Sequence, residues 1–461
     1  MNAKVHMRCK LFGATAVAAL SLSSAPLAAH AQAASSLRAK ISQLFIFGEG
    51  DDPLFLAGTA DPSNPESIRE HGSHFVPSAV SANGSLIGFI GGALSTSVGN
   101  LPIGASSGGV TFRFEGGVPV KTSTSAGPIF AERAQTLGQG RALVGVNRNS
   151  FHFSTLRGVP MNDIELIFTH ENVNFPGCDS IAGGDCSKMG IPVLENDIMQ
   201  FRLNLDLNVA VTNMYATYGV TDWFDLGVVV PLVSTSLHGQ SDAQVIPFGG
   251  PTAAHFFAGT PQDPVLSAER VVDGSAFGVG DVAVRSKISV HQTERSSVAL
   301  LGEARFPTGA ADDLLGAGAF SARGEAVISG VIGAFSPHAN VGYIYHAKNS
   351  QHLWNDAILA TAGFDDLIAP NITLAADIVS ELQVGESNLT LPGPVTFDSP
   401  FHRVIQPTTI PDMRDDLVNG SFGFKFGLPN NFTLVTNALI PLNKGGVRPN
   451  LTYTTGLEFN F

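Results

Sequence analysis

The clearest pattern in the chain lies at residues 199–211, which read MQFRLNLDLNVAV. Every odd position there is apolar, and every even position except Ala210 is polar. This period of two predicts a β-strand, because a helix would scatter the apolar residues around its circumference. The segment is longer than the usual strand of about five or six residues and long enough for the ~9–11 residues of a tilted transmembrane strand. A half-buried soluble strand shows the same alternation.

The alternation recurs along the rest of the chain. It is found at 282–290, 298–306, 372–381, 422–427 and 432–440. The sequence therefore predicts an all-β fold, either a soluble sandwich or a transmembrane β-barrel. In a sandwich the apolar face fills the core, whereas in a barrel it meets lipid and the polar face lines the lumen. Alternation alone does not separate these two folds.

The lengths of the connections favour the barrel. Short and long connections alternate along the chain, as expected for tight periplasmic turns and longer extracellular loops. The short connections are near 219–222, 291–296, 333–338, 364–371 and 428–431, and the long ones are 234–276, 307–319, 348–355, 384–416 and 442–449. We predict an antiparallel transmembrane β-barrel of about 14 strands, with a range of 12–16, the number being even as in bacterial single-chain barrels.

The last strand gives a third argument for a barrel. LTYTTGLEFNF alternates apolar and polar residues and closes on Phe461. A C-terminal aromatic residue on an alternating strand resembles the signal by which bacterial outer-membrane barrels are recognised for insertion. We therefore expect the barrel-assembly machinery to be a partner, with Phe461 as the candidate insertion signal.

The N-terminal residues predict export. Residues 1–31 combine a basic start, a short apolar stretch and an Ala29-His30-Ala31 cleavage site, which together predict a signal peptide. We expect the barrel to occupy 108–461 and residues 32–107 to form a plug or the first strands. Within that region, 37–47 is consistent with a helix or a strand, and 85–98 with a strand or an apolar plug.

The amino-acid composition further restricts the class of protein. Charged residues make up 14% of the 461 residues and the mean hydropathy is +0.18, whereas soluble domains carry about 25% charged residues. The net charge of −13 argues against nucleic-acid binding. After removal of Cys9 with the signal peptide, Cys178 and Cys186 remain, and in an oxidising compartment they predict one disulfide.

No convincing active site, cofactor motif or metal motif is found. GASSG at 104–108 matches the nucleophile-elbow pattern, but no helical pattern follows it. The remaining candidates for function are the polar residues that the alternation assigns to the lumen. These are Arg202, Asp206, Asp225, Arg285, Lys287, Glu303, Arg305, Arg323, Glu325, Asp377, Glu381 and Lys425. Their mixed signs fit either the wall of an open pore or a salt-bridge network that fills a closed lumen.

Four segments carry a family resemblance: YGVTDWFDLGVVVPLV, GVGDVAVRSKISV, RFPTGAADDLLGAGAF and FSPHANVGYIY, in this order. Over roughly 130–461 the chain resembles the meta-pathway phenol-degradation or "transporter" family of bacterial outer-membrane β-barrel proteins. The resemblance implies an outer-membrane channel for passive uptake of small-molecule solutes, including hydrophobic or aromatic compounds, with outer-membrane lipid around the barrel.

Two alternatives remain open. The first is a structural or surface-interaction barrel with a closed lumen, contacted by partners through loops 170–197, 234–276 and 384–416. The second is an outer-membrane hydrolase, which would need a Ser and a His that meet on one face of the barrel.

Overall fold

The computed structural model describes residues 35–47, 57–59, 75–76, 90–94, 112–115, 118–121, 125–170, 197–248, 255–260, 263–348, 355–387, 389, 391–397 and 401–461. The predicted signal peptide, the GASSG motif, Cys178 and Cys186 lie outside these residues. One compact unit contains 36–461. The predicted all-β fold is confirmed.

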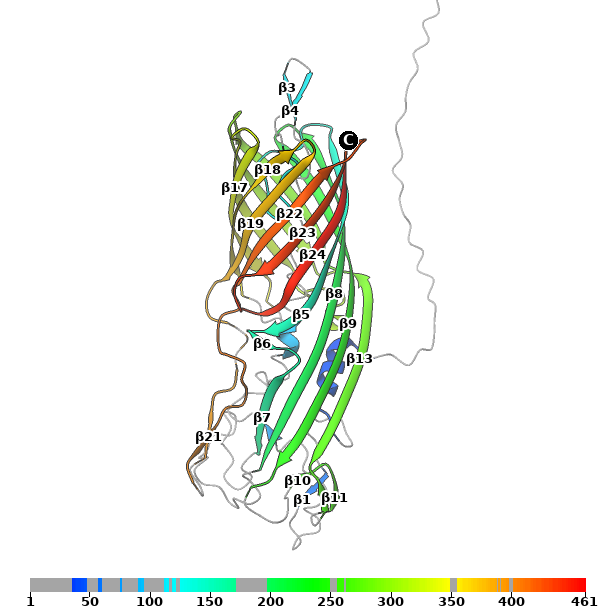
Figure 1. Cartoon of the computed structure of the whole chain (residues 1–461), viewed down its shortest axis with the longest axis vertical. Helices are drawn as coiled ribbons and strands as arrows, with labels where there is room; N and C mark the ends of the chain where they lie inside the picture. The colour runs from blue at the N-terminus through cyan, green and yellow to red at the C-terminus, as the bar shows by residue number, and fades with distance from the viewer. Residues whose placement is uncertain are drawn as a thin grey trace, which may run out of the picture. The chain divides into compact units, whose positions relative to one another are not determined.

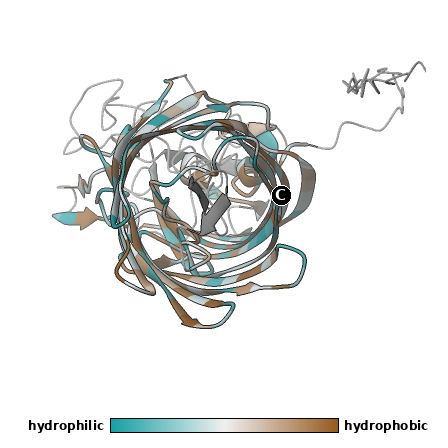
Figure 2. Cartoon of the chain, turned by 90° about the horizontal axis from the view of Figure 1, so that it is seen from above, coloured by the Kyte–Doolittle hydropathy of each residue, from teal (hydrophilic) through white to brown (hydrophobic). Residues whose placement is uncertain are grey.

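Twelve antiparallel strands close into a barrel (Figures 1 and 2). Each strand pairs with the next, and β8 pairs with β9 to complete the ring. The strands are β5 (Ala142–Leu156), β8 (Ile198–Thr221), β9 (Phe224–Ile246), β14 (Val282–Gln292), β15 (Ser296–Phe306), β16 (Ser321–Gly330), β17 (Phe335–His346), β18 (Ala357–Ala369), β19 (Ile372–Gln383), β22 (Leu417–Gly427), β23 (Phe432–Pro441) and β24 (Val447–Asn460). The count lies at the lower limit of the predicted range.

The first strand of the wall is β5, which begins later in the chain than the predicted boundary at residue 108. Before it come α1 (Leu37–Gln43) and the short strands β1 (Ala57–Thr59), β2 (Phe75–Val76), β3 (Phe112–Glu115) and β4 (Val118–Lys121). Residues 90–94 are helical. The ambiguous segment 37–47 thus begins with a helix, whose N-cap Ser36 side chain accepts a hydrogen bond from the N–H of Ala39.

The polarity of the wall is that of a membrane barrel. Large apolar side chains face outward on every wall strand, for example Val146, Met214, Val228, Ile328 and Phe422, whereas the inner face is polar. The inner set includes Asn147, Asn213, Lys287, Glu303, Asp377, Lys425 and Glu458. A soluble sandwich requires the opposite arrangement, so the wall is the lipid-facing surface of a transmembrane barrel.

All five predicted short connections are turns at one end of the barrel, the end that also holds Phe461 (upper end in Figure 1). The long connections lie at the other end. In bacterial barrels the short-turn end is periplasmic and the long-loop end extracellular. The predicted long connection 234–276 is wrong, because β9 continues to Ile246 and β13 (Ser267–Val279) pairs with it along its whole length.

The strands β8, β9 and β13 run well beyond the barrel on the extracellular side (Figure 1). Together with β7 (Ile164–His170) they form a sheet that we call the extracellular extension. Shorter elements accompany it: β6 (Val159–Pro160), β10 (His255–Phe256), β11 (Ala258–Thr260), β12 (Asp263–Val265), the 3-10 helix η1 (Ala311–Asp313), β20 (Val395–Phe397) and β21 (Arg403–Ile405).

Along β8 the polarity of the two faces reverses. Residues 199–211 place their apolar side chains inward, into a hydrophobic core, whereas farther along the strand Asn213 and Thr217 face inward and Met214 and Tyr218 face outward. The extension therefore has the polarity of a soluble sheet. The clearest alternating segment in the sequence belongs to this extension and not to the part of β8 that crosses the membrane.

Candidate functional site

A network of ion pairs crosses the inner wall of the barrel on β14, β15 and β16. The Glu303 carboxylate is its centre and accepts from Arg285, Arg305 and Arg323, the last at 3.2 Å. Arg323 also pairs with Glu325 at 3.3 Å. The register explains the cluster, because Arg285 and Arg323 are the direct cross-strand partners of Glu303. Each charge is thus compensated across the ladder, as burial of charged groups requires.

A second element of the lumen comes from the chain before β5. Residues 125–141, here called the lumen segment, have no regular secondary structure and lie against the inner wall. Glu132 in this segment receives Lys287 Nζ at 2.8 Å and lies 3.8 Å from Arg285 Nη1. The next residue, Arg133, pairs with Asp365 on β18. All five of these side chains are buried.

Backbone groups of the lumen segment bind wall side chains as well. The N–H of Ala134 donates to Ser329 Oγ at 2.9 Å, and the N–H of Leu137 donates to Asp225 Oδ2 at 2.9 Å. The N–H of Ala126 donates to Thr373 Oγ1 at 2.9 Å. These donors would otherwise be buried without a partner, so the wall residues substitute for the secondary structure that the segment lacks. The segment is therefore held along its length against the inner wall.

The periplasmic end of the lumen segment needs a glycine in the wall. Gly219 lies in the YGVTDW motif, at the end of β8. A Cβ at this position would lie 1.9 Å from the carbonyl oxygen of Gly138. The two backbones also exchange hydrogen bonds, from Gly219 N–H to Arg141 O at 2.9 Å and from Gly140 N–H to Gly219 O at 2.8 Å. The family motif thus holds a residue that the seating of the lumen segment requires.

A cavity of about 100 Å³ lies in the extracellular half of the lumen. One part of its lining is the ion-pair network, and the other part mixes apolar side chains with polar ones. Phe130 and Glu132 of the lumen segment line it together with Glu303, Arg305, Arg323, Glu325, Asn340, Ile344, Leu359, Thr361, Val379, Ser380 and Glu381. The cavity therefore offers charged, hydroxyl and hydrocarbon surfaces within one small space, next to the lumen segment.

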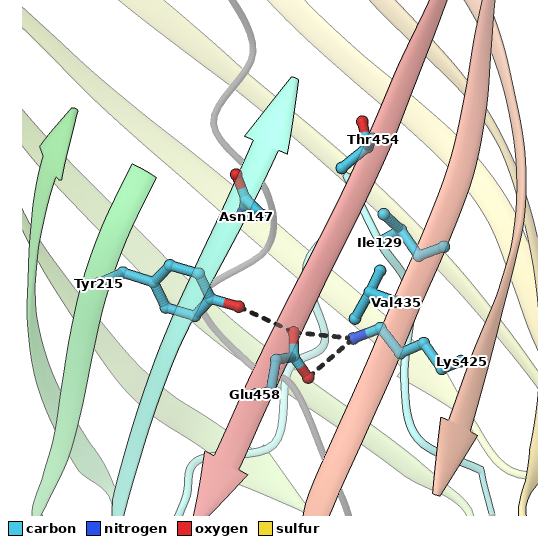
Figure 3. A pocket seen from close by; sticks show the side chains of 7 residues that line it. All are labelled: Ile129, Asn147, Tyr215, Lys425, Val435, Thr454 and Glu458. Carbon is cyan, nitrogen blue, oxygen red and sulfur yellow. Dashed lines mark hydrogen bonds and ion pairs between the residues drawn. The ribbon is translucent and has the colours of Figure 1, made fainter. Parts of the chain in front are cut away.

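A separate polar cluster connects wall strands to one another (Figure 3). The Tyr215 hydroxyl donates to Glu458 Oε1 at 3.1 Å, and Lys425 Nζ lies 3.4 Å from the same oxygen. The side chains come from β8, β24 and β22 and enclose a space of only about 10 Å³, beside Ile129 of the lumen segment. This cluster joins wall to wall, whereas Glu132 and Arg133 join the lumen segment to the wall.

The extracellular loops are fastened by two buried polar clusters. Arg157 donates to both oxygens of Asp415 at 2.7 Å and to Ser387 Oγ at 2.9 Å, which anchors the loop 384–416. Asp197, at the start of β8, accepts from the N–H of Phe248 at 2.7 Å and pairs with His255 Nδ1 at 2.8 Å. Burial raises the pKa of Asp197 to about 7, although these hydrogen bonds oppose the shift.

The structure separates the predicted lumen residues into two groups. The prediction is wrong for Arg202 and Asp206, which lie on the outer, polar face of the extracellular extension because the polarity of β8 is reversed there. The others lie on the inner face of the wall: Asp225, Arg285, Lys287, Glu303, Arg305, Arg323, Glu325, Asp377, Glu381 and Lys425. Their part in solute passage stays a prediction.

Several residues of the site were not predicted from the sequence. Glu132 and Arg133 lie in a stretch without alternation, so no strand phase assigned them to the lumen. Asp365, which binds Arg133, lies within the segment taken as a turn, 364–371. An unpatterned stretch that carries an adjacent acid and base just before the first wall strand is the signal that would have identified the lumen segment.

None of the helices in the described part of the chain has the length and apolarity needed to cross a membrane. Among the same residues, no group of three or more His, Cys, Asp or Glu side chains is placed to hold a metal ion.

Residues 196–378 match the family model described as "Putative MetA-pathway of phenol degradation". The predicted family resemblance is confirmed. The match covers β8, β9 and β13 of the extension and most wall strands, and it includes the four motifs of the sequence analysis. Single-chain barrels with an even number of strands are characteristic of bacterial outer membranes, which confirms the predicted location.

The solved structures that are similar to the chain have low sequence identity to it. An outer membrane channel from Pseudomonas putida F1 is 11% identical, with 71% of this chain and 98% of that chain covered and a TM-score of 0.38. The Ralstonia pickettii toluene transporter TbuX is 10% identical, with coverages of 70% and 90% and a TM-score of 0.31. A Pseudomonas aeruginosa FadL homologue is 11% identical, with coverages of 69% and 88% and a TM-score of 0.28. No curated protein matches the chain.

Proposed function

We propose that the protein is a passive outer-membrane channel for small hydrophobic or aromatic molecules, and that the lumen segment is its closing element. The observation that carries the proposal is the cavity of about 100 Å³ that lies against Phe130 and Glu132. A solute that enters the lumen from outside reaches this cavity before it meets the lumen segment. Passage to the periplasm then requires the segment to move.

The charge balance of the cavity lining favours uncharged solutes over ions. The carboxylates Glu132, Glu303 and Glu325 are balanced by arginines and by Lys287 through the ion pairs described above. A ring of one sign would favour ions of the other sign, whereas a balanced network offers no net attraction to either. The apolar part of the lining suits a hydrocarbon surface, and the description of the matched family, which names phenol degradation, is consistent with an aromatic solute.

The proposal is tested by permeation into liposomes that contain the refolded mature protein. Phenol should enter faster than into protein-free liposomes, and benzoate, an anion of similar size, should gain much less. Phenol also crosses lipid directly, so the comparison needs the Glu132→Gln variant, which is expected to increase the protein-dependent part of the rate. Equal rates with and without protein, for wild type and variant alike, would refute the channel.

The alternative of a structural barrel with a closed lumen is favoured by one observation, the density of ion pairs between the lumen segment and the wall. It predicts that freeing the segment changes stability but permits no passage. A hydrolase has less support. Ser125 is buried, and its hydroxyl donates to Asp365 and accepts from Arg133. The barrel-assembly machinery remains the proposed partner for insertion, through Phe461.

A further inference from the structure

The N-terminal residues of the described chain lie on the extracellular side of the barrel. The helix α1 packs on β13, and β13 pairs with β9 at the end of that strand remote from the periplasmic turn (Figure 1). Lys40 Nζ donates to the carbonyl oxygen of Asp273 at 2.6 Å, and Arg270 Nε donates to Ile46 O at 2.5 Å. Residues 36–47 and 90–94 are here called the N-terminal arm.

The arm is part of the core of the extracellular extension. Leu37, Ile41, Leu44, Phe45 and Phe47 are each at most 2% exposed. Their neighbours in the core include Phe168 and Phe201 on β7 and β8, with the rings of Phe45 and Phe201 5.7 Å apart. Ile90 and Leu94 are buried in the same core. This degree of burial indicates a fixed position for the arm.

The sheet has glycines where the arm approaches it. A Cβ at Gly274 of β13 would lie 2.5 Å from Leu37 Cδ2, and a Cβ at Gly239 of β9 would lie 2.9 Å from Leu44 Cδ1. Both glycines stand on the inner face of their strands. The glycines thus leave space for the arm on the sheet, since any larger residue at Gly274 would collide with Leu37.

The described residues before the first wall strand lie at both ends of the barrel. Leu94 lies in the extracellular core, whereas the lumen segment lies within the closed wall and joins β5 at the periplasmic end. We infer that the barrel has passed its own N-terminal arm outward and displays it on the cell surface.

Cysteine labelling on intact cells tests this topology. Gln43 is the exposed residue of α1 and becomes the probe as Gln43→Cys, in a background with Cys178→Ser and Cys186→Ser. Asp412→Cys, in the loop 384–416, serves as the extracellular control, since Asp412 is 85% exposed. Glu294→Cys, in the turn between β14 and β15, is the periplasmic control. The reagent is a membrane-impermeant maleimide.

Labelling of Gln43→Cys on intact cells to within about threefold of Asp412→Cys is the expected result, with Glu294→Cys labelled only after the outer membrane is permeabilised. Labelling of Gln43→Cys only after permeabilisation, or only after denaturation, would overturn the inference. As a second readout, an epitope inserted between Ser35 and Ser36 should bind antibody on intact cells.

Substitution of a glycine tests whether the arm is packed on the sheet and not only exposed on the cell surface. Gly274→Leu should release the arm and increase cleavage at Arg38 and Lys40 by trypsin added outside the cells at least tenfold. Gly324→Leu on β16 is the matched control, because a Cβ there meets no atom within 4 Å. Equal trypsin cleavage of the two variants would contradict the docked position of the arm.

Discussion

Glu132→Gln is the substitution that addresses closure most directly. In the closed barrel Glu132 and Lys287 are both buried, and their charged atoms lie 2.8 Å apart. The variant keeps the shape of the side chain but leaves the Lys287 ammonium without its carboxylate. Breaking a buried ion pair by removing one partner costs about 3–5 kcal/mol. In this protein that cost falls on the closed state, because a displaced lumen segment leaves Lys287 accessible to water.

This free-energy cost to the closed state shifts the equilibrium toward the open channel. Each 1.36 kcal/mol changes an equilibrium about tenfold, so a cost of about 3–5 kcal/mol should raise the open-to-closed ratio about 150- to 5000-fold. Single-channel recording in a planar bilayer gives this ratio from the fraction of time spent open. The double variant Glu132→Gln/Lys287→Met should open less often than the single variant, because it no longer buries an unpaired charge.

Glu458→Gln is the control for a general loss of stability. Glu458 is equally buried and also pairs with a lysine, Lys425, but both residues belong to the wall. This variant should lower the temperature at which the barrel unfolds and leave the open fraction close to that of the wild type. If Glu132→Gln opens no more often than Glu458→Gln while both are folded, the lumen segment is not held closed by this ion pair.

Three further predictions concern the loops and the periplasmic end. Arg157→Ala leaves the buried Asp415 unpaired and should cost about 3–5 kcal/mol, detected as faster proteolysis of the longest extracellular loop; unchanged proteolysis would contradict the anchor. Asp197 has a pKa of about 7 in the folded state against 3.8 ordinarily, so the folded state binds a proton that the unfolded state has lost. The extension should therefore lose stability, by up to about 4 kcal/mol, as pH rises between those values; pulse proteolysis should show this dependence in the wild type, and its persistence in Asp197→Asn would exclude this carboxyl as the cause. Gly219→Ala forces its Cβ against the carbonyl of Gly138 and should increase the open fraction in bilayers, whereas an unchanged fraction would mean that the lumen segment tolerates the displacement.

The wall strands could be predicted from the sequence because each strand that crosses the membrane alternates apolar residues toward lipid with polar residues toward the lumen. The turns near 219–222 and 428–431 and the loop 384–416 were predicted closely, since Gly, Pro, Asn and Asp interrupt the alternation there. Residues 199–211 misled the interpretation. A strand that leaves the membrane keeps its period of two while its faces exchange polarity, so periodicity does not show which face is inside.

The lumen segment could not be predicted by the same reasoning. Its position depends on single contacts to residues far away in sequence, such as Glu132 with Lys287 and Ala134 with Ser329. None of these contacts leaves a periodic signal. The charged residues of the wall could be predicted because they occupy the alternating polar positions of their strands. The groups of the lumen segment that bind them lie in a stretch without such alternation.

A reversible cross-link between the lumen segment and the wall gives the most direct test of the account. The Ala134 N–H lies 2.9 Å from Ser329 Oγ, so Ala134→Cys/Ser329→Cys, in a background without the native cysteines, should form a disulfide. When this pair is reduced, we expect protein-dependent entry of phenol into liposomes. Oxidation should abolish that entry, and added reductant should restore it. Equal protein-dependent entry in the oxidised and reduced states would contradict the claim that the lumen segment closes the channel.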